Sequence, residues 1–168
     1  SQSIMDCAAA LFAKEGYPAA KMQDVAKACG ATKSMLYHYF PTKDDLLFAM
    51  LNEHLQRLIQ GVEEGLASTD EPRERLRRLV EVYTQKSTQS RRRHMVAMND
   101  VKFLPRAKQQ PLIDLQRQLT HLVSQLLQQI NPGLPEAVYK PYAMMLIGML
   151  NWSDFWYKPS GPVKPAEL

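Results

Sequence analysis

The first fifteen residues carry apolar side chains at helical spacing. They follow one another at i, i+3, i+4, i+7 and i+8: Ile4, Cys7, Ala8, Leu11 and Phe12. This spacing places side chains on one face of an α-helix. Gly16 and Pro18 come directly afterwards, and both residue types end helices. The pattern therefore predicts a first amphipathic helix that ends at about residue 15.

Two short helices are predicted next, on either side of a tight turn. A second apolar stripe consists of Met22, Val25, Ala26 and Cys29. It stops at Gly30, since glycine readily takes the left-handed conformation that closes a helix. A further helix is predicted from Lys33 to Phe40, because Pro41 disfavours helical geometry in the residue before it. Residues 30–32 form the turn between the two.

The rest of the chain also has helical patterning. Thr42 and Asp45 form the T-x-x-D capping box of a fourth helix, whose apolar face continues to Val62. Further helices are predicted at about 71–89, 91–104, 111–130 and 135–157, separated by prolines and by the Asn-Pro-Gly turn at 131–133. No stretch alternates apolar and polar residues over the length of a strand. The fold class is therefore all-α.

Composition narrows the possible functions further. The net charge is +4, yet residues 1–50 hold five lysines and five acidic residues, so the total charge does not locate a basic face. No apolar run approaches the ~20 residues of a membrane span, and no signal peptide opens the sequence. We expect a soluble, cytoplasmic protein without membrane contact. Cys7 and Cys29 are expected to be small buried thiols and not a disulfide.

No arrangement of catalytic or metal-binding residues is recognisable. The four histidines, residues 38, 54, 94 and 121, are scattered, and no Cys or Glu joins them at metal-ligand spacing. A glycine-rich phosphate loop is also missing. We therefore expect no enzyme activity, no cofactor and no metal site.

The helix at 33–40 separates its side chains into two arcs. At about 100° per residue, Lys33, Tyr37, Ser34 and His38 cover one arc, whereas Met35, Tyr39, Leu36 and Phe40 cover the other. The first arc offers an amine, a phenol, a hydroxyl and an imidazole, which bond phosphate oxygens and base edges. The second arc is expected to pack on the two preceding helices. Two helices around a glycine turn make a helix-turn-helix, whose second helix enters the major groove of DNA.

Lys43 lies in the first turn of the fourth helix, where a cation opposes the helix dipole. A DNA phosphate bound by the backbone N–H groups and the Lys43 amine would compensate for this. The alternative is a solvated lysine beside Asp44 and Asp45.

Residues 4–50 resemble the N-terminal domain of TetR-family transcriptional regulators. The motifs that carry the resemblance are AAALFAKEGY and MQDVAKACGATKSMLYHYFPTKDDLL. The resemblance implies a homodimer that binds double-stranded operator DNA. The positions that match DNA contacts of the family are Thr32, Lys33, Ser34, Tyr37, His38, Tyr39 and Lys43, with Gln23 as a further candidate. Family members usually carry a basic extension before the first helix and a last helix beginning near 165–168.

The tract Tyr142–Leu150, YAMMLIGML, is apolar on all sides of its predicted helix. This pattern indicates burial on more than one face, either at the centre of the domain alone or also against a second subunit. The family resemblance implies pairing through the last two helices, and Gly148 would permit close approach.

A narrower resemblance concerns TetR-family members that sense acyl-CoA thioesters. It rests on NDVKFLP, GMLNW and FWYKPSGP. It implies a small-molecule effector in an apolar tunnel lined by Tyr83, Met95, Met98, Asn99, Phe103, Met145, Met149, Trp152 and Trp156. Core packing is the alternative for each of these residues. Arg91–Arg93 is interpreted either as a site for coenzyme A phosphates or as a solvated helix start.

Together these patterns predict a helix-turn-helix DNA-binding domain at 1–45 and a ligand-binding and dimerisation domain at 46–168. The predicted function is a repressor released from a palindromic operator by a small effector that changes the separation of the two recognition helices. The alternatives are a multidrug or aromatic sensor of the same fold and a helical interaction protein that does not bind DNA.

Overall fold

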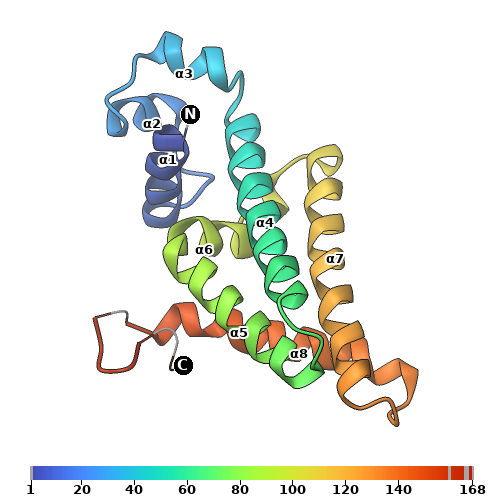
Figure 1. Ribbon diagram of the computed structural model, residues 1–168. Helices are drawn as coiled ribbons and strands as arrows, with labels where there is room; N and C mark the ends of the chain where they lie inside the picture. Colours follow the sequence, from blue (N-terminus) through green and yellow to red (C-terminus); the bar gives the residue numbers. More distant parts are fainter. Residues whose placement is uncertain (1, 159, 165–166, 168) are drawn as a thin grey trace. The chain divides into compact units, whose positions relative to one another are not determined.

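Figure 1 shows the chain as a computed structural model, which describes residues 2–158, 160–164 and 167. Over these residues the secondary structure is entirely helical. The elements are α1 (Gln2–Glu15), α2 (Met22–Ala28), α3 (Lys33–Tyr39), α4 (Lys43–Ala67), α5 (Pro72–Gln89), α6 (Arg91–Asn99), the 3-10 helix η1 (Val101–Phe103), α7 (Arg106–Ile130) and α8 (Glu136–Trp156). The predicted fold class is confirmed. Most of the expected last-helix start at 165–168 lies outside the described residues.

Two predicted helix boundaries were wrong, both near prolines. The helix predicted at 91–104 ends at Asn99 and is followed by η1, while α7 starts at Arg106, five residues before Pro111. Pro111 was predicted to begin the helix but lies inside it. Pro111 is the sixth residue of α7, so its missing N–H leaves out one backbone hydrogen bond close to the start of the helix. The Pro105 carbonyl accepts from the Lys108 and Gln109 N–H groups, 2.9 and 3.0 Å away, and so starts α7.

The chain forms two compact units. The first comprises Ser1–Leu55 and Ser90–Ile113, and the second comprises Gln56–Gln89 and Asp114–Leu168. In the first unit α1 packs against α2 and α6, and α2 packs against α3. Its core includes Ala8, Phe12, Val25, Leu36, Leu47, Met50 and Val96. Cys7 and Cys29 carry free thiols, as predicted, although both are half-buried.

The second unit has its own apolar core, which α4, α5, α7 and α8 share. Leu58, Val62, Leu79, Tyr83, Val123 and Ala143 are among its buried members. α4 approaches α5 closely at two glycines. A Cβ atom at Gly61 or Gly65 would lie 3.1 or 3.2 Å from a Val82 methyl group. These glycines therefore allow α4 and α5 to pack at short range.

Candidate nucleic-acid interface

The turn before α3 has the backbone geometry that its sequence predicts. Gly30 adopts φ +62°, in the left-handed region, which favours glycine. Thr32 caps α3, because its Oγ1 accepts a hydrogen bond from the Met35 N–H at 3.1 Å. The turn and the cap together fix where α3 begins and which way its side chains point.

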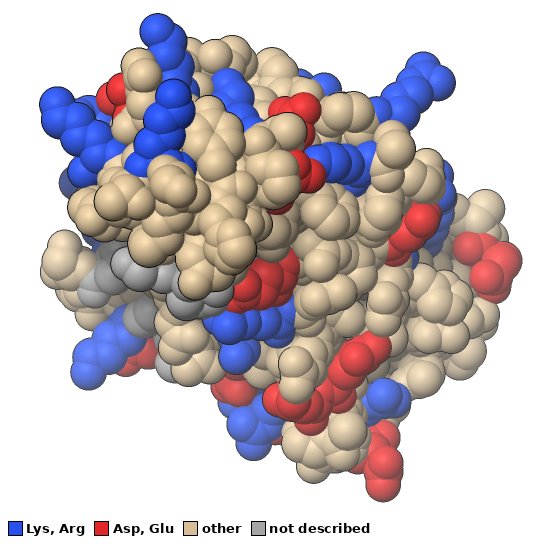
Figure 2. Space-filling model, turned by 90° about the horizontal axis from the view of Figure 1, so that it is seen from above, with Lys and Arg blue, Asp and Glu red and all other residues tan. Residues whose placement is uncertain are grey.

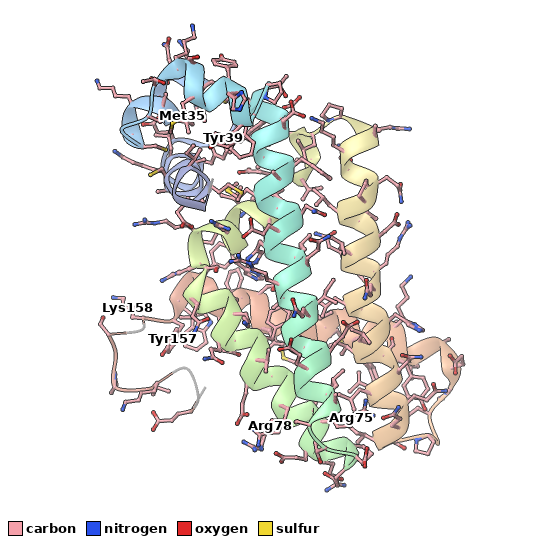
Figure 3. All side chains as sticks on the ribbon, turned by 45° about the horizontal axis from the view of Figure 1, so that its top comes forward. Met35, Tyr39, Arg75, Arg78, Tyr157 and Lys158 are labelled. Atoms are coloured by element: carbon pink, nitrogen blue, oxygen red, sulfur yellow. The ribbon has the colours of Figure 1, made fainter. Side chains whose placement is uncertain are left out.

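α3 is anchored through a narrow strip. Leu36 is fully buried and Phe40 nearly so, whereas Lys33, Ser34, Tyr37 and His38 are exposed, as predicted. Met35 and Tyr39 were predicted to pack on the preceding helices, but they are 44% and 52% exposed. Figure 3 labels both on α3. The buried strip is centred on Leu36 and Phe40, and Met35 lies roughly 100° around the helix from Leu36, too far to reach the core.

Several exposed side chains of α3 are also in contact with one another. The Lys33 ammonium lies over the Tyr37 ring, 5.8 Å from its centroid. The His38 and Tyr39 rings meet edge to face with centroids 5.5 Å apart. These contacts hold a cation, an imidazole and two phenols ready on one short helix, and all of these groups bond phosphate oxygens or base edges.

The start of α4 contains the predicted capping box. The Thr42 N–H donates to Asp45 Oδ2 at 3.0 Å, and the Asp45 N–H donates to Thr42 Oγ1 at 3.0 Å. Lys108 of α7 also donates to Asp45. The Lys108 ammonium, followed by the Thr42 hydroxyl, holds the pKa of the Asp45 carboxyl below its usual range. Asp45 therefore joins the start of α4 to the first turn of α7.

Lys43 makes intramolecular contacts that the sequence did not indicate. Its Nζ donates to the carbonyls of Tyr17 and Ala20 at 2.8 and 3.0 Å, and lies 4.3 Å from the centroid of the Tyr17 ring. Tyr17 in turn donates to Asp44, and burial followed by this bond raises the Tyr17 pKa. The carbonyls of the loop between α1 and α2 thus compensate for a cation in the first turn of α4.

The first unit also exposes basic side chains beyond α3. They include Lys14, Lys21, Lys27, Arg92, Lys102 and Arg106, and Gln23 on α2 is exposed as well. Figure 2 shows the molecule from above, with Lys and Arg side chains spread over this face among Asp and Glu side chains. Exposed Lys and Arg side chains can pair with the phosphates of a polyanion such as DNA.

The predicted effector residues are divided between the two units. Met95, Met98, Asn99 and Phe103 belong to the first, and Phe103 stacks on Tyr17 with ring centroids 6.0 Å apart. In the second unit Tyr83 is buried and its hydroxyl donates to Asn151. The other four lie exposed on α8: Met145, Met149, Trp152 and Trp156.

A polar cluster lies inside the first unit, and no sequence pattern predicts it. Arg93 is buried, and its Nη2 lies 2.7 Å from Asp6 of α1, while its Nη1 lies 3.4 Å from Glu53 of α4. Beside it, His54 Nε2 and His94 Nδ1 lie 2.9 Å apart. Neither interpretation of Arg91–Arg93 anticipated a buried Arg93. Only the three-dimensional approach of α1, α4 and α6 brings these residues together.

The described residues contain neither a metal-binding cluster nor a membrane-spanning helix. No group of three or more His, Cys, Asp or Glu residues is placed to hold a metal ion. Among the same residues, none of the helices has the length and apolar character to cross a membrane.

The fold and the helix-turn-helix geometry define a class of helical DNA-binding regulator, and sequence comparison gives its family. Residues 4–50 match the family described as bacterial regulatory proteins, tetR family, and residues 69–168 match the tetracyclin repressor-like C-terminal domain. The chain belongs to the TetR family of transcriptional regulators.

Solved structures extend the likeness to nearly the whole chain. A TetR-family transcriptional regulator from Bordetella parapertussis 12822 is 34% identical, with a TM-score of 0.94 over 99% of this chain and 88% of that one. AibR, solved in complex with isovaleryl coenzyme A and operator DNA, is 23% identical, with a TM-score of 0.85 over 98% of this chain and 90% of that one. At that identity AibR shows the fold alone.

A curated relative matches a shorter region. The transcriptional activator FasR of Mycolicibacterium smegmatis is 36% identical over 80 residues, which are 48% of this chain and 36% of FasR. The aligned region thus spans about a third of that regulator.

Proposed function

We propose that this chain is a ligand-responsive DNA-binding transcriptional regulator that reads operator DNA through α3. The observation that carries the proposal is the exposure of α3 on every side except the strip formed by Leu36 and Phe40. A helix held in this way can enter the major groove without losing its anchor. The side chains proposed to contact DNA are Gln23, Thr32, Lys33, Ser34, Tyr37, His38 and Tyr39.

Lys43 is proposed to act differently from these residues. A phosphate at the start of α4 would compete with the Tyr17 and Ala20 carbonyls for the Lys43 amine. We therefore assign Lys43 to positioning the loop between α1 and α2 against α4. The exposed residues of α3 remain as the direct contacts.

Binding to selected DNA tests the proposal. A duplex is selected from a randomised library with the intact chain, and its affinity is measured by fluorescence anisotropy at several salt concentrations. We expect a steep loss of affinity as salt rises, because phosphate contacts release counterions. Tyr37→Ala and His38→Ala should each weaken binding by about tenfold. His121→Ala, at an exposed position of α7 in the second unit, should not. Failure to select any duplex would favour the helical interaction protein.

When it is bound to operator DNA, the chain is proposed to pair with a second copy of itself. α8 exposes large apolar side chains along one face, namely Tyr142, Met144, Met145, Met149, Trp152, Phe155 and Trp156. Six of the seven are more than half exposed, a patch of the kind that marks a protein interface. A symmetric dimer would present two α3 helices to the two halves of a palindromic operator.

The effector is proposed to be an acyl-CoA thioester. The support is the resemblance of the NDVKFLP and GMLNW motifs to acyl-CoA-responsive members, together with the isovaleryl coenzyme A named for AibR. Tyr83, Met95, Met98, Asn99 and Phe103 remain proposed effector contacts. The four exposed α8 residues Met145, Met149, Trp152 and Trp156 fit the dimer face better than an enclosed pocket.

Thermal unfolding against a panel of ligands tests the effector. A thioester at 100 times its dissociation constant should stabilise the chain by about 2.7 kcal/mol, and isovaleryl-CoA is the first compound to use. Stabilisation by free aromatics or drugs and by no thioester would point to the multidrug sensor.

We propose repression as the sign of regulation, since a dimer lying across successive major grooves blocks the same face of the duplex to other proteins. FasR is named an activator, so transcription from the operator with and without the chain decides the sign. The effector would act by binding the conformation with the wrong spacing of α3 helices more tightly. We propose a cytoplasmic location, where operator DNA is accessible, and no enzyme activity.

A further inference from the structure

The side chains of α3 form four rows, each made of residues i and i+4. Successive rows lie about 100° apart around the helix. One row, Leu36 and Phe40, is buried. The row farthest from it is Ser34 and His38, and it is flanked by Lys33 and Tyr37 on one side and by Met35 and Tyr39 on the other.

The two flanking rows differ in chemistry. Lys33 and Tyr37 form a cation–π pair and offer charged and polar groups to phosphates. Met35 offers only methylenes, a thioether sulfur and a terminal methyl group, and the residue is 44% exposed. Its backbone is fixed by the bond from its N–H to Thr32 Oγ1. The side chain therefore projects from a defined place in the first turn of α3.

In helix-turn-helix proteins the first residues of the recognition helix contact base edges. Met35 is the third residue of α3, whereas Tyr39 is the last and lies farther along the groove. Of the groups that base pairs present in the major groove, the 5-methyl of thymine is the apolar one. Contact with this methyl group would remove apolar surface of both partners from water.

On this basis, and resting on the proposed DNA binding, we propose that Met35 is a specificity-determining residue that recognises a thymine in each half-site through its 5-methyl group. Ser34 and His38, in the adjoining row, supply hydrogen bonds to neighbouring base edges. The recognition element is thus a polar row with an apolar row beside it. Polar side chains alone would make no favourable contact with the thymine methyl group.

Deoxyuridine substitution tests this contact atom by atom. Deoxyuridine pairs as thymidine does and lacks only the 5-methyl group. In a duplex selected by the intact chain, each thymine is replaced in turn, and affinities are measured for the intact chain, Met35→Ala and Ser34→Ala. The intact chain should lose about fourfold in affinity for each half-site at one thymine position, as removal of one buried methyl group predicts.

The variants distinguish the proposal from a general loss of binding. Met35→Ala should bind thymine and deoxyuridine at that position equally, while Ser34→Ala should bind more weakly yet keep the preference. Both positions are exposed, so both variants should fold, and circular dichroism checks this. A methyl preference that survives in Met35→Ala, or is missing from the intact chain at every thymine, overturns the role of Met35 and leaves the DNA-binding function standing. Failure of the intact chain to select any duplex would overturn both.

Discussion

At the scale of single residues, the most unusual site is the buried histidine pair of the first unit. His54 of α4 and His94 of α6 share a hydrogen bond, and Arg93 of α6 lies next to them with its partners Asp6 and Glu53. Burial, followed by the charges of His94 and Arg93, lowers the pKa of His54 to about 3. His54 therefore stays neutral in the folded protein at any pH where the chain is expected to work.

This depressed pKa predicts a loss of stability in mild acid. Below pH 6.5 the unfolded chain binds a proton at His54 that the folded chain does not bind. The free energy of unfolding should therefore fall as the pH falls from about 6.5 toward 3, by about 1.4 kcal/mol per pH unit for this one proton. Urea unfolding at pH 7, 6 and 5 measures the effect.

His54→Gln provides the comparison, because its amide can still bond His94 and does not titrate. We expect its stability to depend less on pH than that of the unchanged chain, by about one proton. His121→Gln, at an exposed position, should behave as the unchanged chain does. Equal pH dependence in His54→Gln and in the unchanged chain would contradict the account.

Among the helices, the boundaries that depend on bonds between nearby residues could be predicted from the sequence. Thr42 and Asp45 predicted the start of α4, and Gly30 predicted the end of α2, because each acts through bonds within a few residues. The start of α7 was wrongly predicted at Pro111, because the effect of a proline depends on its position along the helix. The prediction that Met35 is packed was wrong, because this seven-residue helix buries only one row of side chains and the pattern predicted two.

In the candidate site, too, features set by nearby residues could be predicted from the sequence, and features set by distant residues could not. The exposed row of Ser34 and His38 follows from helix geometry alone. By contrast, the bonds of the Lys43 amine to the Tyr17 and Ala20 carbonyls depend on a loop more than twenty residues away. The ion pairs of Arg93 with Asp6 and Glu53 span 87 and 40 residues. The spacing of residues within one segment cannot predict partners that are so far away in the sequence.

The capping box of α4 yields a prediction at this scale. Asp45→Ala removes the acceptor for the Thr42 N–H and also the contact with Lys108. We expect it to lower the free energy of unfolding by about 0.5 to 2 kcal/mol, the usual range for lost helix caps. Asp114→Ala is the matched control, because its 3.2 Å pair with Arg117 is exposed and such pairs contribute little. Chemical unfolding compares the two, and equal losses would count against a special role for Asp45.

In the whole assembly, binding to a palindromic operator requires two copies of the chain, and these are proposed to be joined through α8. Gly148 lies on the exposed face of α8, where an added Cβ meets no atom of the described residues within 4 Å. Gly148→Leu should therefore leave the single chain folded and should hinder close approach of a second α8. Sedimentation velocity should show a shift from dimer toward monomer.

Ala67→Leu is a suitable control for this experiment. Ala67 is the exposed last residue of α4, so the substitution adds the same side chain outside α8 and should leave the dimer intact. A Gly148→Leu variant that sediments as the unchanged dimer would exclude this part of α8 from the interface.

A dimer of this chain is proposed to place two α3 helices in successive major grooves of one operator. Hydroxyl-radical footprinting of the selected duplex would detect this arrangement. We expect two protected stretches on one face of the duplex, with centres about one helical turn, roughly 34 to 36 Å, or a multiple of it apart. At a concentration where the unchanged chain occupies about half of the duplex, protection by Tyr37→Ala should be several-fold weaker, because its affinity is about tenfold lower. A single protected stretch, or protection that Tyr37→Ala leaves unaltered, would contradict the claim.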